Sequence, residues 1–229
     1  MSSADRSTVL VTGGTGALGT AVCRRLLSEG YSVHVTWVSE AERDRFPLTD
    51  QCQLHQVELT DEVAVTELYR KVGSLWASIH VAGGFAMAPI ESMSLADFDL
   101  MFQRNAVSAF LCCREAVRTM RLEGGGGRLV NVGARPAVEP AGGMLAYTTS
   151  KAAVTSMTQC LAKELVDESI LVNAILPSIM DTPANRAGMP DADFTAWPTV
   201  EEVAETIAWL ASPENTLTTG TLLPVYGRG

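Results

Sequence analysis

The sequence predicts an α/β domain in which a doubly wound parallel sheet of about seven strands carries helices on both faces. Two observations support this prediction: short β-branched apolar runs alternate with longer amphipathic stretches, and a glycine-rich turn directly follows the first run. Such alternation is typical of βα units stacked into a parallel sheet. The predicted strands are residues 8–11, 32–37, 53–57, 78–82, 128–132, 171–175 and 222–225.

Two long helices are predicted among the connections between these strands. Apolar side chains recur three or four positions apart over residues 95–120, and a second long helix is expected over residues 147–166. Residues 124–127, 135–143 and 177–198 read as loops. The last segment contains four prolines and follows a strand. This pattern indicates a substrate-binding loop or lid, although an ordinary surface excursion fits it as well.

Length and charge limit the classes of function. With 229 residues and 47% hydrophobic content, residues 1–229 are expected to form a single domain around one large core. The net charge of −9 and the isoelectric point near 4.8 disfavour nucleic acid and anionic membrane surfaces as partners. No apolar stretch has the length of a membrane span or of a signal-peptide core, which predicts a cytoplasmic protein.

The cysteines and histidines do not suggest a metal site. The five cysteines lack the C-x-x-C spacing, and we expect reduced thiols that mostly fill the core. Cys112 and Cys113 point in different directions on a predicted helix, so packing is the simpler role for both. His34, His55 and His80 are too scattered to form a ligand triad.

The first predicted strand leads into the sequence TGGTGALG at residues 12–19, and a helical pattern follows. Glycines let the chain turn tightly and bring backbone N–H groups close to a pyrophosphate. The N-terminus of the helix adds a partial positive charge. The sequence therefore predicts the dinucleotide-binding turn of a Rossmann-like fold, and a purely structural turn is the alternative.

The end of the second predicted strand bears on which dinucleotide fits. Chains that bind NAD usually carry an acidic residue there for the ribose hydroxyls, whereas this strand ends in TWVS at residues 36–39. The missing carboxylate removes a repulsion against a 2′-phosphate, and Ser39 and Arg43 are candidate contacts for that group. NADP(H) is therefore slightly favoured, and NAD(H) stays open because Glu40 is a candidate ribose ligand.

Tyr147 and Lys151 stand four positions apart at the start of a predicted helix, so their side chains share one face. A nearby ammonium group stabilises a phenolate and is expected to lower the pKa of the tyrosine towards neutrality. Tyr147 is then a candidate proton donor for a substrate that accepts hydride.

Several motifs together resemble the short-chain dehydrogenase/reductase family over nearly the whole chain. They are TGGTGALG, Asn105 in the long helix, YTTSK at residues 147–151 and NAILPSIMDT at residues 173–182. Within the family, IHVAGGF at residues 79–85 and DTPANRAGMPDADFTAW at residues 181–197 resemble quinonoid dihydropteridine reductase.

The resemblance implies roles for particular residues. Tyr147 becomes the proton donor, Lys151 binds the nicotinamide ribose and tunes Tyr147, and Asn105 holds a water that relays protons. Glu58 stands where the family often has an aspartate facing the adenine. The predicted cofactor-binding residues are Gly13, Thr15, Gly16, Ala17, Leu18, Gly19, Trp37, Ser39, Glu58, Leu59, Ala82, Gly83, Gly84, Lys151, Pro177, Ser178, Ile179 and Thr182.

One position departs from the family pattern. Members that act on alcohols and ketones usually carry a serine thirteen positions before the tyrosine, and this chain has Ala134 there. Dihydropteridine reductases resemble this chain in lacking that serine. A quinonoid dihydropterin is an electron-poor ring with imine-like nitrogens, so it needs less help from an oxyanion-type donor.

The leading hypothesis is therefore NAD(P)H-dependent reduction of a quinonoid dihydropterin or a similar imine-like ring. A carbonyl reductase or alcohol dehydrogenase of the same family is the first alternative, and a non-catalytic NAD(P)-binding protein is the second. Ala134 is a candidate substrate residue, and so are Arg186, Phe194 and Trp197, for which surface exposure or local packing is the plainer interpretation. The two long helices resemble the pair through which the family forms homodimers and homotetramers.

Overall fold

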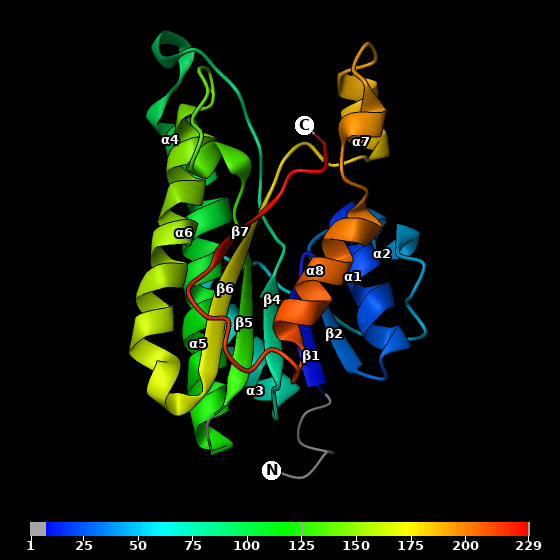
Figure 1. Ribbon diagram of the computed structural model, residues 1–229, viewed down its shortest axis with the longest axis vertical. Helices are drawn as coiled ribbons and strands as arrows, with labels where there is room; N and C mark the ends of the chain where they lie inside the picture. The colour runs from blue at the N-terminus through cyan, green and yellow to red at the C-terminus, as the bar shows by residue number, and fades with distance from the viewer. Residues whose placement is uncertain (1–7, 125, 229) are drawn as a thin grey trace.

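The computed structural model describes residues 8–124 and 126–228 and contains a sheet of seven parallel strands in the order β3-β2-β1-β4-β5-β6-β7 (Figure 1). All seven strands were predicted, and their bounds differ from the prediction by at most two residues. The strands are β1 Thr8–Thr12, β2 Ser32–Trp37, β3 Gln53–Gln56, β4 Ala77–His80, β5 Gly127–Val132, β6 Ile170–Pro177 and β7 Leu222–Val225.

Helices cover both faces of this sheet, as predicted (Figure 1). One apolar cluster joins the sheet to α1 and α8, and a second joins the opposite face to α3, α5 and α6. The sheet is therefore buried on both sides, which explains why its strands read as continuous apolar runs. The helices are α1 Ala17–Ser28, α2 Glu40–Arg45, α3 Glu62–Val72, α4 Leu95–Phe102, α5 Ser108–Leu122, α6 Leu145–Leu165, α7 Pro183–Gly188 and α8 Val200–Ala211.

The long helix predicted over residues 95–120 is interrupted in its middle. It consists of α4, a π-helical segment Gln103–Val107 and α5, all of which continue one another along the chain. A π-helical turn accommodates an extra residue, so it rotates the side chains that follow it and is frequent at functional sites. Asn105 lies in this segment and is almost completely buried.

The strand order reverses between β1 and β4, which lie side by side although two strands separate them in sequence. In open α/β sheets, ligands bind beyond the carboxyl ends of the strands at such a reversal. The connection after β6, predicted as a long loop, contains α7 and a short 3₁₀ turn Phe194–Ala196. Among the described residues, no helix has the length and apolar character needed to cross a membrane.

Candidate active site

A cleft of about 510 Å³ opens at the carboxyl ends of the strands, where the strand order reverses. It brings together the glycine-rich turn, the end of β2 and the start of α6, which are far apart in sequence. Its lining residues are Gly13, Thr15, Gly16, Ala17, Leu18, Gly19, Thr36, Trp37, Val38, Glu42, Leu59, Val81, Ala82, Gly83, Gly84, Phe85, Val132, Gly133, Ala134, Tyr147, Lys151, Pro177, Ser178, Met180, Thr182 and Asn185.

The glycine-rich turn is built so tightly that side chains are excluded. Gly13 has φ of +63°, and a Cβ atom there would lie 2.8 Å from the backbone of Ala82. A Cβ atom on Gly19 would collide with the backbone of Gly13 and Gly14. Gly16 begins α1 without a side-chain cap, so the first N–H groups of the helix point towards the cleft mouth. This cradle suits a pyrophosphate.

Two hydrogen bonds fix the turn to its neighbouring strands. The Gly13 N–H donates to Thr36 Oγ1 at 3.1 Å, and the Ala82 N–H donates to Thr12 Oγ1 at 3.3 Å. These side chains come from β2 and β1, so the turn is held by the sheet rather than by its own sequence alone. Sequence reasoning did not identify Thr36 as part of the site.

At the end of β2, the structure places some predicted residues in the cleft and others outside it. Trp37 and Leu59 line the cleft, whereas Ser39 and Glu58 do not. The Ser39 hydroxyl caps α2 by accepting from the Glu42 N–H at 3.3 Å. The Glu58 carboxylate accepts from the Thr60 hydroxyl at 2.9 Å. Ser39 and Glu58 thus form hydrogen bonds with residues two or three positions further along the chain. The prediction from the strand ends did not consider these local bonds.

Glu42 is the carboxylate that sequence reasoning missed. It lines the cleft, and its Oε2 accepts from the Val38 N–H at 3.4 Å, whereas the sequence had suggested Glu40. The spacing Ser39-x-x-Glu42 is that of a helix-capping box and could have indicated that Glu42 folds back towards the strand end. Beside it, the Arg43 guanidinium lies 5.2 Å from the centroid of the Trp37 ring and pairs with Asp44.

Tyr147 and Lys151 both line the cleft, as predicted. Lys151 Nζ donates to the Val132 carbonyl oxygen at 2.7 Å, which anchors the amine at the end of β5. Burial lowers the pKa of Lys151 to about 8 and raises the pKa of Tyr147 to about 12. Desolvation is the cause of both shifts, and the predicted tuning of Tyr147 by Lys151 stays a prediction.

Asn105 does not line the cleft, but its hydrogen bonds connect two segments that form the cleft. Its Oδ1 accepts from the Gly84 N–H at 2.9 Å, and its Nδ2 donates to the Gly84 carbonyl at 3.0 Å and to Ser150 Oγ at 3.0 Å. Ser150 Oγ in turn donates to the Tyr147 carbonyl at 2.7 Å. The π-helical segment thus connects the loop after β4 to the start of α6.

The wall beside Tyr147 is apolar and aromatic. Ala134 lines the cleft with only 3% of its surface exposed, and it offers no hydroxyl to a substrate. Phe85 lines the same space, and its ring stands edge-on to the Tyr147 ring with centroids 4.9 Å apart. Phe85 stays 60% exposed, so much of its side chain is accessible to a ligand. Phe85 belongs to the IHVAGGF motif but was not predicted as a site residue.

The loop after β6 contributes only its first part to the cleft. Pro177, Ser178 and Thr182 line the cleft as predicted, Ile179 does not, and Met180 and Asn185 were missed. Of the four predicted substrate residues, Ala134 lines the cleft, whereas Arg186, Phe194 and Trp197 do not. Arg186 pairs with Asp181 at 2.5 Å and lies over the Phe194 ring, which packs against the Trp197 ring. Their mutual contacts agree with the plainer interpretation of local packing.

Comparison with known proteins decides the family. The model of short chain dehydrogenases matches residues 7–193. The chain belongs to the short-chain dehydrogenase family. It is 29% identical to YohF, an uncharacterized oxidoreductase of Escherichia coli, over 95% of this chain and 93% of that protein. It is 28% identical to acetoacetyl-CoA reductase of Cupriavidus necator, over 92% of each.

A solved structure shows the same fold. ElxO with NADP bound superposes with a TM-score of 0.89 at 25% identity, covering 97% of this chain and 98% of that one. The protein is an NAD(P)-dependent oxidoreductase of the short-chain dehydrogenase family. These relatives do not support the closer resemblance to dihydropteridine reductase. The residues of this short-chain dehydrogenase fit the cofactor, because its glycine-rich turn leaves a side-chain-free cradle at an uncapped helix N-terminus.

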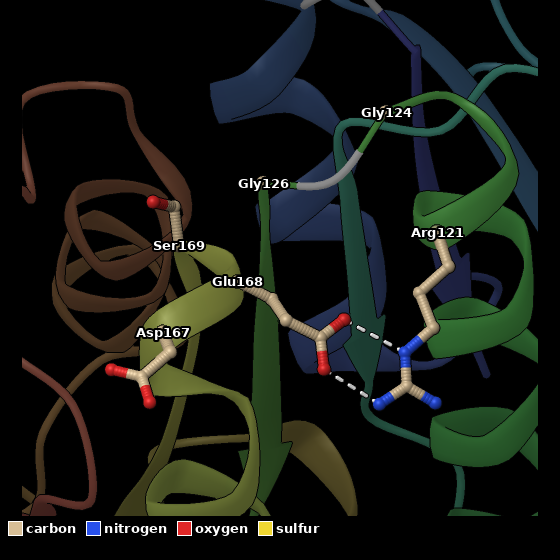
Figure 2. Close-up of a pocket in the computed structure, with 6 residues that line it drawn as sticks. All are labelled: Arg121, Gly124, Gly126, Asp167, Glu168 and Ser169. Atoms are coloured by element: carbon tan, nitrogen blue, oxygen red, sulfur yellow. Dashed lines mark hydrogen bonds and ion pairs between the residues drawn. The ribbon is translucent and has the colours of Figure 1, made fainter.

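A second cavity, of about 530 Å³, lies at the opposite end of the sheet of this dehydrogenase (Figure 2). Arg121 and Glu168 point towards each other there and form a two-bonded ion pair at 2.6 and 2.7 Å. The two charges neutralise each other. Gly124 and Gly126, which also line this cavity, are far from Tyr147. Within residues 8–124 and 126–228, no cluster of three metal-ligating side chains occurs.

Proposed function

We propose that the protein reduces a planar, imine-like ring, with a quinonoid dihydropterin as the substrate class. The observation that carries this proposal is the wall beside Tyr147, where Ala134 replaces the family hydroxyl and Phe85 presents an accessible aromatic side chain. A ketone needs a donor on its developing oxyanion. A quinonoid ring instead needs a flat apolar slot and one proton, and Phe85 and Tyr147 suit those requirements.

The cofactor would bind along the cleft, with its pyrophosphate at the glycine-rich turn and its nicotinamide ribose at Lys151. Bound there, it supplies hydride to the substrate. Arg43 beside Trp37 supports a 2′-phosphate, and ElxO, a relative by structure, has NADP bound. Glu42 is suited to ribose hydroxyls, so NADH is also accommodated, with NADPH slightly favoured.

We assign Tyr147 the role of proton donor. With a pKa of about 12, it holds its proton throughout the neutral range and is ready to donate when hydride makes the substrate nitrogen basic. Lys151, fixed on the Val132 carbonyl, orients the ribose and stabilises the phenolate that forms. Asn105 acts through Gly84 and Ser150, and is therefore a positioning residue here rather than a demonstrated water ligand.

Reduction of a ketone or aldehyde is the second candidate. The relative named acetoacetyl-CoA reductase acts on an oxo group, and Tyr147 and Lys151 suit such a substrate equally well. In this case a water molecule or a nearby hydroxyl must replace the missing serine. Ser178 and Thr182 are the hydroxyls that line this part of the cleft.

The test compares the wild type with Ala134→Ser, using NADPH and NADH separately against quinonoid dihydropterin and a panel of ketones. The proposal predicts cofactor oxidation with the pterin, little turnover of ketones, and a gain of ketone turnover in Ala134→Ser. Rapid ketone reduction by the wild type without any pterin turnover would select the carbonyl reductase instead. Tyr147→Phe is the inactive control in both cases.

Assembly and location are further parts of the proposal. A single domain of residues 1–229 would form a homodimer or homotetramer through the faces of α4, α5 and α6, where Leu100 and Phe110 are 43% and 47% exposed. All five cysteines are free thiols, which suits a cytoplasmic location. Light scattering of the wild type and of Phe110→Glu tests the assembly, and a smaller particle is expected for the variant.

A further inference from the structure

Arg135 and Tyr226 form a side-chain pair that the proposed reaction does not use. The Arg135 guanidinium carbon lies 4.7 Å from the centroid of the Tyr226 ring, which is within the range of a cation–π contact. Arg135 begins a short 3₁₀ turn that follows β5, and Tyr226 directly follows β7. Because β5, β6 and β7 pair in parallel, the two residues lie beyond the same edge of the sheet.

The pair borders the cleft next to Ala134. Ala134, which precedes Arg135, lines the cleft, and so does Ser178, which follows the intervening strand β6. The Ser178 hydroxyl donates to the Tyr226 carbonyl oxygen at 2.8 Å. Figure 1 shows the chain after β7 running towards α7, which contributes Asn185 to the cleft lining. The Arg135 and Tyr226 side chains therefore stand at the rim of the active-site cleft.

Two of the three guanidinium nitrogens of Arg135 are available to a ligand. Its Nε donates to Glu139 Oε2 at 2.8 Å, and the described residues form no other hydrogen bond with this guanidinium. The side chain is 38% exposed, so Nη1 and Nη2 are accessible. The Tyr226 ring and the Glu139 carboxylate hold the group in place at the same time. A planar fork held in this way matches the two oxygens of a carboxylate.

The charged residues inside the cleft have other tasks. Among the described residues that line it, Lys151 is the cation and Glu42 is the anion. Lys151 Nζ is bound to the Val132 carbonyl and is assigned to the nicotinamide ribose, and Glu42 lies near the end of β2. An anionic substituent on a substrate would therefore find its counter-charge at the rim, where Arg135 stands. In a chain of net charge −9, such a local cation also offsets the general repulsion of anions.

We propose that Arg135, held against Tyr226, binds a carboxylate carried by the substrate, so that the substrate is an anionic, planar, imine-like heterocycle. This inference rests on the proposed function, because it takes the reacting ring to lie beside Phe85 and Ala134. A carboxylate on the outer edge of that ring then extends past Ala134 to the rim. There Nη1 and Nη2 of Arg135 donate one hydrogen bond to each carboxylate oxygen.

The exposure of Arg135 sets the size of the expected effect. Hydrogen bonds between charged partners are stronger than neutral ones, but water and salt screen a pair at the rim. We therefore expect a carboxylate to bind about tenfold more tightly than a neutral amide of the same shape. Glu139 places a negative charge on the same guanidinium, so Glu139→Gln should tighten carboxylate binding by a further factor of about three.

The experiment titrates the full-length protein, saturated with NADP⁺, with two pairs of fluorescent probes. Each pair consists of a carboxylate and the carboxamide of the same ring: pterin carboxylate with pterin carboxamide, and naphthoate with naphthamide. Dissociation constants are measured from the probe fluorescence. We expect the carboxylate of each pair to bind more tightly, with a preference that shrinks at high salt. If the naphthalene pair shows the preference and neither pterin binds, the carboxylate site stands and the pterin substrate is wrong.

Arg135→Gln should bind both members of a pair equally and keep its affinity for NADP⁺, which separates this site from the cofactor site. Arg135→Lys keeps the charge without the planar fork, so it should retain a smaller preference. Arg70→Gln is the matched control, because Arg70 also pairs with a glutamate on the surface, and it should behave like the wild type. The proposal is overturned if the wild type binds carboxylate and carboxamide equally, if it binds neither pair, or if Arg135→Gln keeps the preference.

Discussion

Replacement of Asn105 by alanine should destabilise the protein and disturb its cleft at the same time. The side chain makes two hydrogen bonds to Gly84 and one to Ser150 Oγ, at 2.9 to 3.0 Å. A hydrogen bond contributes about 1 kcal/mol net, so Asn105→Ala should lower the free energy of unfolding by about 3 kcal/mol. For a chain of this size, that corresponds to a melting temperature lower by about 6 to 12 °C.

The assay is thermal and urea unfolding followed by circular dichroism, together with the NADPH dissociation constant. Gln103→Ala is the matched control, because Gln103 lies in the same π-helical segment but is exposed. Its unfolding free energy should change by no more than about 0.5 kcal/mol. If Asn105→Ala is as stable as Gln103→Ala and binds NADPH normally, Asn105 does not organise the cleft.

Three further predictions concern the turn, the pH dependence and the cofactor choice. Gly19→Ala should abolish NADPH binding because its Cβ atom collides with the backbone of the turn. Gly142→Ala is the control and should bind NADPH normally, because the space around Gly142 is open. Equal binding by both variants would contradict the placement of the pyrophosphate at the glycine-rich turn. Burial lowers the pKa of His34 and of His80 to about 4, so the unfolded state takes up protons first as the pH falls below 6.5. Stability should therefore be lost with falling pH, by about 2 kcal/mol per histidine at pH 5, and urea unfolding of His80→Asn should show a shallower slope. Glu42→Gln removes a negative charge from the part of the cleft where the adenosine ribose is proposed to bind, and it should improve NADPH affinity over NADH affinity about fivefold in fluorescence titrations. An unchanged ratio would place Glu42 away from the 2′ position.

The sequence predicted the features that depend on local pattern. Strands buried on both faces read as apolar runs, and the turn of residues 12–19 must be glycine-rich because a Cβ atom at Gly13 or Gly19 meets backbone. The position of Tyr147 and Lys151 near that turn followed from their order along the chain, since each further βα unit adds its loop at the same edge of the sheet.

The features that escaped prediction depend on tertiary contacts. The π-helical turn at Asn105 satisfies the backbone of Gly84, a residue twenty-one positions earlier that no helical periodicity reports. Glu42 reaches the cleft because its carboxylate turns back to Val38. Burial shifts the pKa values of Tyr147 and Lys151, and spacing on a helix predicts proximity but not burial.

The proposed function requires that this cleft holds the nicotinamide cofactor and that Tyr147 delivers the proton that accompanies hydride transfer. The most direct test is single-turnover oxidation of prebound NADPH by quinonoid dihydropterin, compared between the wild type and Tyr147→Phe over the non-enzymatic background. Proton donation by Tyr147 predicts equal NADPH affinity for the two proteins and a rate at least about 100-fold lower in the variant. Equal rates at equal affinity would contradict it, because the proton would then come from another group.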